Sequence, residues 1–199
     1  MLDGGLRLLG TVDDSVTRGS TATTPSLGAV LVKAAASHTL TYFVVGVSSF
    51  FVLDYAAAFV APETAGYLRP TTDALVMAGP IFQPVRGALL GSALWLVRDA
   101  VFAAPRGWLR IWAILLVVGV VSPFGAMPGS IEGLVYTTWP VSAHLRLLPE
   151  LVVQTGLLSW LLHSWVVRPD RRWMTWTVGG GAVVVVALAV AGLAASAAR

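Results

Sequence analysis

Several apolar stretches of about 20 residues constrain this fold most, because a helix of that length crosses the roughly 30 Å hydrocarbon core of a bilayer. Five such stretches occupy residues 38–61, 72–97, 108–127, 143–167 and 173–195. They predict an all-α, polytopic membrane protein, with a bundle of about five transmembrane helices formed by residues 38–199. Residues 1–37 are expected to form a cytoplasmic N-terminal tail that is partly amphipathic.

Composition agrees with a membrane protein and excludes other classes. Hydrophobic residues make up 56% of the chain and charged residues 12%, which is about half the charged fraction of a soluble domain. The net charge is only +3, so the chain lacks the strongly basic face of a nucleic-acid-binding protein. We therefore expect the lipid bilayer as a partner, no nucleic acid, and neither a soluble enzyme nor a disordered tail.

Two of the stretches leave alternatives open. The stretch 72–97 contains two prolines, a glutamine and an arginine, so two half-helices are the alternative to one span. Residues 26–37 could extend the first span, lie along the membrane surface or belong to a loosely ordered tail. The first stretch is expected to be an uncleaved span because 38 residues precede it, although residues 56–58 could mimic a signal-peptide cleavage site.

The positions of the basic residues predict the orientation, because Lys and Arg concentrate on the cytoplasmic side. Arginines cluster around the turns that follow the second and fourth stretches, at Arg98, Arg106, Arg110, Arg168, Arg171 and Arg172. The loop 128–142 carries no Lys or Arg. We therefore expect a multi-pass protein of the cell membrane whose N-terminus is cytoplasmic and whose C-terminus lies outside.

Three ionisable residues stand out inside the expected spans, namely Asp54, Arg86 and Glu150. A charge at such a position costs roughly 2.5–3.5 kcal/mol on insertion scales, so it marks a functional candidate. At about 1.5 Å per helical residue the three lie about 24, 18 and 27 Å from the cytoplasmic interface, and they could meet in the outer part of the bilayer. Gln83 shares a helix face with Arg86, and Gln154 shares one with Glu150. We expect Arg86 to pair with Glu150 or Asp54 in an outward-facing polar pocket.

The segment 122–142 predicts a short interfacial helix at the outer surface. Ser130 is suited to cap its N-terminus and Pro140 to end it. Glu132 and His144 could then reach the rim of the polar pocket. The alternative is a solvated loop with ordinary polar residues.

Other motifs are few. Gly87 and Gly91 form a GxxxG pattern, which predicts a close approach to another helix. The chain has no Cys and no motif of nucleotide-binding proteins, zinc hydrolases or serine hydrolases, so no cofactor and no metal site is expected. His38 and His163 are both expected near the cytoplasmic side, and they are the one pair that could face each other as haem ligands.

These observations give three hypotheses for the function. The first is a small membrane protein whose outward-facing pocket binds or passes a small solute, an ion or a lipid headgroup through Arg86, Gln83, Asp54, Glu150, Gln154, Glu132 and His144. The second is a non-catalytic subunit or assembly factor that packs against a membrane protein partner, in which the Arg–carboxylate pair only locks helices together. The third is a membrane-embedded enzyme that modifies lipids with Glu132 or Glu150 as acid/base and His144 beside it. The sequence favours a protein that is not an enzyme.

Overall fold

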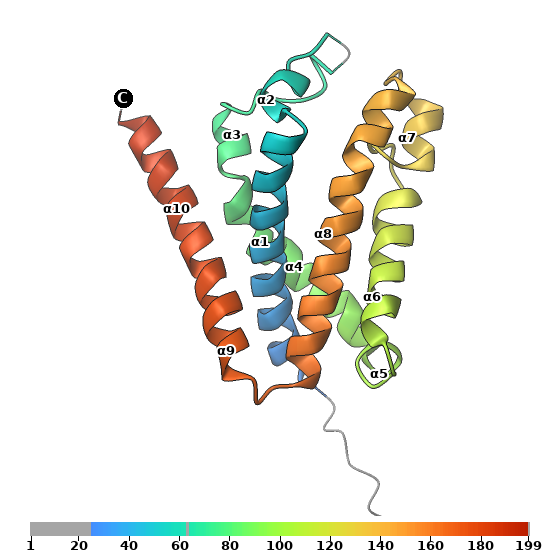
Figure 1. Ribbon diagram of the computed structural model, residues 1–199, viewed down its shortest axis with the longest axis vertical. Helices are drawn as coiled ribbons and strands as arrows, with labels where there is room; N and C mark the ends of the chain where they lie inside the picture. The colour runs from blue at the N-terminus through green and yellow to red at the C-terminus, as the bar shows by residue number, and fades with distance from the viewer. Residues whose placement is uncertain (1–24, 63, 199) are drawn as a thin grey trace, which may run out of the picture.

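The computed structural model describes residues 25–62 and 64–198, and the secondary-structure elements in this part of the chain are all helical (Figure 1). Helices account for 75% of the described residues, so the fold of this part of the chain is all-α, as predicted. Three helical runs are long and apolar enough to cross a membrane, namely α1 (Leu27–Val52), α8 (Val141–Val167) and the run Arg172–Ala197. That run consists of α9 (Arg172–Met174), the π-helical turn η2 (Thr175–Gly179) and α10 (Gly180–Ala197).

Two further helices complete the bundle but are shorter or less apolar. They are α4 (Gly79–Leu96), with 18 residues, and α6 (Gly107–Leu116), with 10 residues, which the π-helical turn η1 (Val117–Val121) extends by 5. These helical runs, α1, α4, α6–η1, α8 and α9–η2–α10, alternate in direction along the chain (Figure 1). By length and composition, three of them qualify as membrane spans, where the sequence predicted about five.

Short helices mark the two ends of the bundle. One end holds α2 (Tyr55–Ala58), α3 (Ala74–Met77) and α7 (Ile131–Tyr136), together with the C-terminus of α10, and we call it the α7 end (Figure 1). The opposite end, which we call the α5 end, holds α5 (Arg98–Val101) and α9. The arginine clusters of the sequence therefore gather at the α5 end, at the turns that flank α5 and α9.

The first helix begins and ends earlier than predicted. The Ser26 hydroxyl caps α1 by accepting a hydrogen bond from the Ala29 N–H at 3.3 Å, so residues 27–37 belong to α1 rather than to a tail. The hydropathy pattern does not reveal this start, because Lys33 interrupts the apolar run. In the structure the amine of Lys33 donates a hydrogen bond to the Trp165 carbonyl at 2.9 Å, so α1 accommodates this charge. The earlier start puts His38 in the middle of α1. Residues 1–24 of the expected tail lie outside the described part of the chain.

The stretch 72–97 is interrupted at Ala78, and not at either of its prolines, Pro80 and Pro84. A four-residue turn, α3, ends at Met77, and α4 then runs from Gly79 through Pro84 without interruption. The stretch is therefore neither one long span nor two half-helices of similar length. An 18-residue helix has a length of about 27 Å, which is close to the thickness of the hydrocarbon core.

The GxxxG pattern on α4 packs against α1. A Cβ atom at Gly87 would lie 2.7 Å from the Ala34 carbonyl oxygen, and one at Gly91 would lie 2.8 Å from the Ala34 side chain. Both distances are shorter than a van der Waals contact, so only glycine allows the two helices to lie this close. The close approach that the sequence predicted for this face is confirmed, and it fixes how α4 presents its polar residues beside α1.

We expect Gly87→Leu to lower the free energy of unfolding by about 1–3 kcal/mol or more, because the new side chain meets backbone atoms of α1 that cannot move aside. Thermal unfolding in detergent micelles measures the change. Gly192→Leu is the matched control, since a Cβ at Gly192 on α10 has nothing within 4 Å. Equal stability of the two variants would contradict this packing.

Candidate ligand-binding pocket

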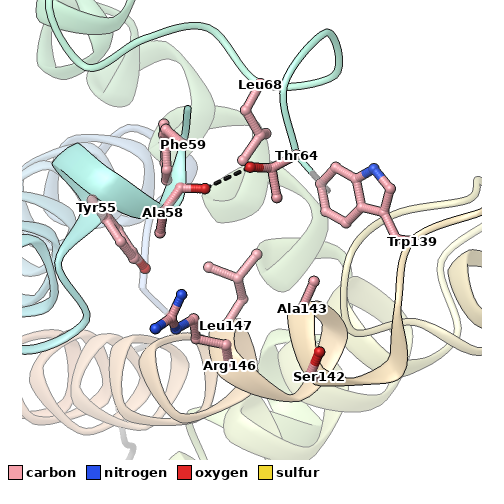
Figure 2. A pocket seen from close by; sticks show the side chains of 10 residues that line it. All are labelled: Tyr55, Ala58, Phe59, Thr64, Leu68, Trp139, Ser142, Ala143, Arg146 and Leu147. Carbon is pink, nitrogen blue, oxygen red and sulfur yellow. Dashed lines mark hydrogen bonds between the residues drawn. The ribbon is translucent and has the colours of Figure 1, made fainter. Parts of the chain in front are cut away.

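Two cavities that contain polar side chains lie along α8. The first, which we call the end cavity, has a volume of about 330 Å³ and lies at the α7 end between α2, the following loop and the first turns of α8 (Figure 2). The second, the middle cavity, has a volume of about 100 Å³ and lies among α1, α4, η1 and α8. Arg146 lines the end cavity, and Arg86 and Gln154 line the middle cavity.

One face of α8 connects the two cavities. Arg146, Glu150 and Gln154 follow one another at intervals of four residues, so they share this face, which we call the α8 polar stripe. Glu150 lies between the cavities and accepts a hydrogen bond from the hydroxyl of Tyr55 in α2. Figure 2 shows the hydroxyl of Tyr55 and the guanidinium of Arg146 pointing toward one another. The short helix α2 therefore contacts the stripe at the point that separates the cavities.

The middle cavity collects unpaired polar groups at half the depth of the bundle. His38 is only 3% exposed and lines this cavity, yet neither of its ring nitrogens has a hydrogen-bond partner among the described residues. Gln83, which does not line this cavity, donates from its amide to the Gly79 carbonyl at 3.0 Å and leaves its own oxygen without a hydrogen-bond partner among the described residues. A buried polar group without a partner is unfavourable by about 1–3 kcal/mol.

The predicted ion pair between Arg86 and a carboxylate is not formed within the described residues. The ion pair found there joins Arg69 and Asp73, at 3.1 Å. Glu150 is directed to Tyr55 instead, which keeps its carboxylate more than 4 Å from the Arg86 guanidinium. Arg86 is an exposed residue that lines the middle cavity, and its charge and that of Glu150 both act on Tyr42 of α1.

Asp54 lies outside the membrane-spanning helix, in contrast to its predicted place inside a span. α1 ends at Val52, and Asp54 adopts a left-handed conformation with φ 47°. Its carboxylate caps α2 by accepting a hydrogen bond from the Ala57 N–H at 3.4 Å. Asp54 is exposed and lines neither cavity, so its contribution to the pocket is to set the direction of α2, whose first residue is Tyr55.

Glu132, in α7, and His144, in the first turn of α8, do not line either cavity. The predicted short helix exists as α7, and Ser130 caps it by accepting a hydrogen bond from the Gly133 N–H at 2.9 Å. His144 is 1% exposed, and its Nδ1 accepts from the Gly129 N–H at 3.0 Å. His144 thus anchors the loop to α8, while Glu132 lies half-buried in the first turn of α7.

We expect His144→Ala to release this loop, because Gly129 would lose the acceptor of its buried N–H and the side chain would leave a hole in the packing. The unfolding free energy should fall by about 1–3 kcal/mol, and proteases should cleave within residues 122–140 at least several-fold faster. Limited proteolysis in detergent measures this rate. Glu132→Ala is the comparison variant, since the described residues give the Glu132 side chain no hydrogen bond. Equal cleavage of the two variants would contradict the anchoring role.

Sequence reasoning missed two residues of the site, His38 and Tyr55. A helix start at the Ser26 cap would have placed His38 at mid-span, where an ionisable residue is a functional candidate by default. Tyr55 gave no such signal, because its place beside Glu150 depends on how the chain turns after α1.

The described residues contain no group of three His, Asp or Glu side chains that could hold a metal ion. Among the described residues, His144 accepts a hydrogen bond from Gly129 and Glu150 accepts one from Tyr55, and no hydrogen bond joins His144 to Glu132 or Glu150. Comparisons with protein-family models, with curated proteins and with solved structures find no match to this chain.

Proposed function

We propose that this chain is a small multi-pass protein of the cell membrane whose polar pocket opens to the outside and binds, or passes, a small solute, an ion or a lipid headgroup. In this arrangement α4 and the α6–η1 run cross the bilayer with the three longer runs, and α7 lies at the outer interface. The arginine clusters at the α5 end make that end cytoplasmic, so the N-terminus is inside and the C-terminus outside.

The observation that carries this proposal is the α8 polar stripe between the two cavities. A polar face in a membrane helix is costly when it faces lipid, and such faces line a water-filled path or a partner. Here the stripe runs from the end cavity at the outer surface toward the middle cavity, where Arg86 and His38 lie. A solute that enters at Arg146 therefore meets Glu150 and then Gln154 on the same helix face.

Because the chain has no Cys, single-Cys variants test whether the pocket is open to the outside. Ala143→Cys places the thiol in the end cavity, Leu151→Cys places it in the middle cavity, and Leu188→Cys places it on the exposed apolar surface of α10. A charged, membrane-impermeant methanethiosulfonate reagent is added from outside to membranes that contain each variant.

We expect position 143 to react fastest, position 151 to react more slowly, and position 188 to remain unlabelled, because a thiol in lipid is not ionised. The modified fraction is read by mass spectrometry over time. An unreactive position 151 in a protein whose position 143 reacts would show that the middle cavity is closed to water, and the proposed function would be wrong.

One observation favours a second function, that of a subunit that packs against a membrane protein partner. An apolar groove of about 780 Å³ runs between α1, α4 and the η2–α10 run and opens to the bilayer side. Small residues such as Ala35, Ala36 and Gly180 line it, and small residues let membrane helices approach closely. If Ala35→Leu abolishes co-purification of a fixed partner in mild detergent while position 151 stays unreactive, this second function is the correct one.

A further inference from the structure

We infer that the end cavity binds a small monocarboxylate with an apolar or aromatic body, and that Arg146 holds its carboxylate. This inference rests on the proposed function, since the cavity must open to the outside, and it names the class of solute that the cavity recognises. Such a solute has a charged end and an apolar end. The wall of the end cavity offers a matching surface to each of them.

The size of the end cavity suits an organic molecule rather than a bare ion. A dry cavity of about 150 Å³ holds one benzene molecule, and the end cavity has a volume of about 330 Å³. Sites for small organic ligands have volumes of about 300–1,000 Å³ and combine apolar side chains with a few polar groups. A ring with a short side chain therefore fills this space, whereas acetate or chloride leaves most of it to water.

Aromatic rings form two sides of the end cavity. Tyr55 and Phe59 lie on one side, with ring centroids 4.9 Å apart, and Trp139 lies on the other side (Figure 2). Trp139 is itself held by Tyr67, whose ring contacts it edge-on with a centroid distance of 6.0 Å. An apolar ligand body between these rings exchanges water for aromatic faces, which favours binding.

Arg146 gives the end cavity its preference for an anion. It lies in the second turn of α8 and is exposed, so a ligand that enters from outside reaches it directly. A guanidinium is always protonated, and its fork of N–H donors binds a carboxylate through two parallel hydrogen bonds. Within residues 25–62 and 64–198 no carboxylate lies within 4 Å of this guanidinium. Glu150, one turn further along α8, accepts a hydrogen bond from Tyr55 instead.

A single charge on the wall matches a single charge on the ligand. Arg146 is the charged side chain among the ten residues that line the end cavity. A phosphate monoester with two negative charges would keep one of them without a counter-ion beside aromatic rings, which is unfavourable. An organic cation would be repelled by Arg146. A neutral alcohol of the same shape fills the apolar part but forms no charge-assisted hydrogen bond.

Isothermal titration calorimetry of the purified full chain in detergent at pH 8 tests the inference, with the heats of injection into detergent alone subtracted. The probes are 3-phenylpropanoate, octanoate, 3-phenyl-1-propanol, 3-phenylpropylamine and benzyl phosphate, at constant ionic strength. We expect a carboxylate to bind at least about tenfold more tightly than the alcohol, the amine and the phosphate, because it alone matches both the charge and the rings. The two carboxylates distinguish two sources, a dissolved aromatic acid and a fatty acid of the bilayer.

Four variants separate the charged end from the apolar end. Arg146→Gln should weaken binding of the carboxylate at least about tenfold and leave the affinity for the alcohol unchanged. Arg146→Lys keeps the charge without the fork, so it should retain the preference for the carboxylate over the amine. Phe59→Ala should weaken binding of carboxylate and alcohol alike, by about fivefold or more. Arg69→Gln is the control and should bind as the wild type does, since Arg69 pairs with Asp73 and does not line the cavity.

The outcomes are distinct. Tighter binding of 3-phenylpropanoate than of octanoate supports a dissolved aromatic acid as the source, and the reverse order supports a fatty acid. Equal affinity for the alcohol, the amine or the phosphate, or an unchanged affinity in a folded Arg146→Gln variant, overturns the inference. So does the absence of any binding to a chain whose positions 143 and 151 react from outside, and this result leaves the proposed function intact. An unreactive position 151 overturns the proposed function itself, whatever the end cavity binds.

Discussion

Replacement of Arg86 by leucine is expected to leave the folded bundle at least as stable as the wild type and to raise its free energy of unfolding by about 1–3 kcal/mol. A guanidinium near the middle of a membrane helix costs roughly 2.5–3.5 kcal/mol on insertion scales, and within the described residues no carboxylate offsets that cost. Leucine removes the cost without leaving an acid unpaired. Thermal unfolding of the purified protein in detergent measures the change.

The opposite result would show that Arg86 is a structural residue. Removal of one partner of a buried ion pair typically destabilises a protein by about 3–5 kcal/mol, because the other charge is left alone. A loss of that size in Arg86→Leu, restored by Glu150→Leu in the same chain, would mean that the two side chains pair in the membrane. Arg69→Leu is the control, since its exposed pair with Asp73 should contribute less than about 1 kcal/mol.

A gain in stability upon removal of a charge has a functional meaning. A costly residue that contributes nothing to folding is retained for what it binds, and binding sites are the places where a sequence departs from its most stable choice. The prediction for Arg86→Leu is therefore a more stable protein whose middle cavity has lost its charge. A helix-locking pair would give a less stable protein instead.

Much of the fold could be predicted because it depends on local patterns. The apolar run of α8 begins two residues from its predicted start and ends at Val167, as predicted. The cap at Ser130 and the close approach at Gly87 follow from the chemistry of one or two residues, and the structure confirms both. The start of α1 was missed because Lys33, which lowers the hydropathy there, makes its hydrogen bond to a carbonyl 132 residues away.

The details of the pocket depend on tertiary structure and could not be read from spacing. Helix periodicity correctly groups Glu150 with Gln154, but it does not say which neighbour Glu150 faces. The choice between Arg86 and Tyr55 is decided by the left-handed residue Asp54, which turns the chain so that α2 folds back onto α8. Non-glycine residues adopt this conformation infrequently, and no pattern in the sequence marks it.

The hydrogen bond from Tyr55 to Glu150 is expected to control passage between the two cavities. It is formed at the point of the α8 polar stripe that separates them, and it joins α8 to a helix of only four residues that follows a left-handed turn. Tyr55→Phe removes the donor while it keeps the ring in place. The lost hydrogen bond contributes about 1–3 kcal/mol to holding α2 against α8. Without it, the cysteine at position 151 should react with the impermeant reagent about 5- to 150-fold faster.

A double-mutant cycle attributes this effect to the pair. Glu150→Leu should accelerate labelling to a similar degree, and the combination with Tyr55→Phe should add little, because the same hydrogen bond is removed in both. Tyr67→Phe is the matched control, since it removes an exposed hydroxyl contact with Thr138 at the same end of the molecule and should leave the rate unchanged. Equal rates in Tyr55→Phe and Tyr67→Phe would show that α2 does not separate the cavities. A solute would then reach Arg86 by a path that does not pass Tyr55.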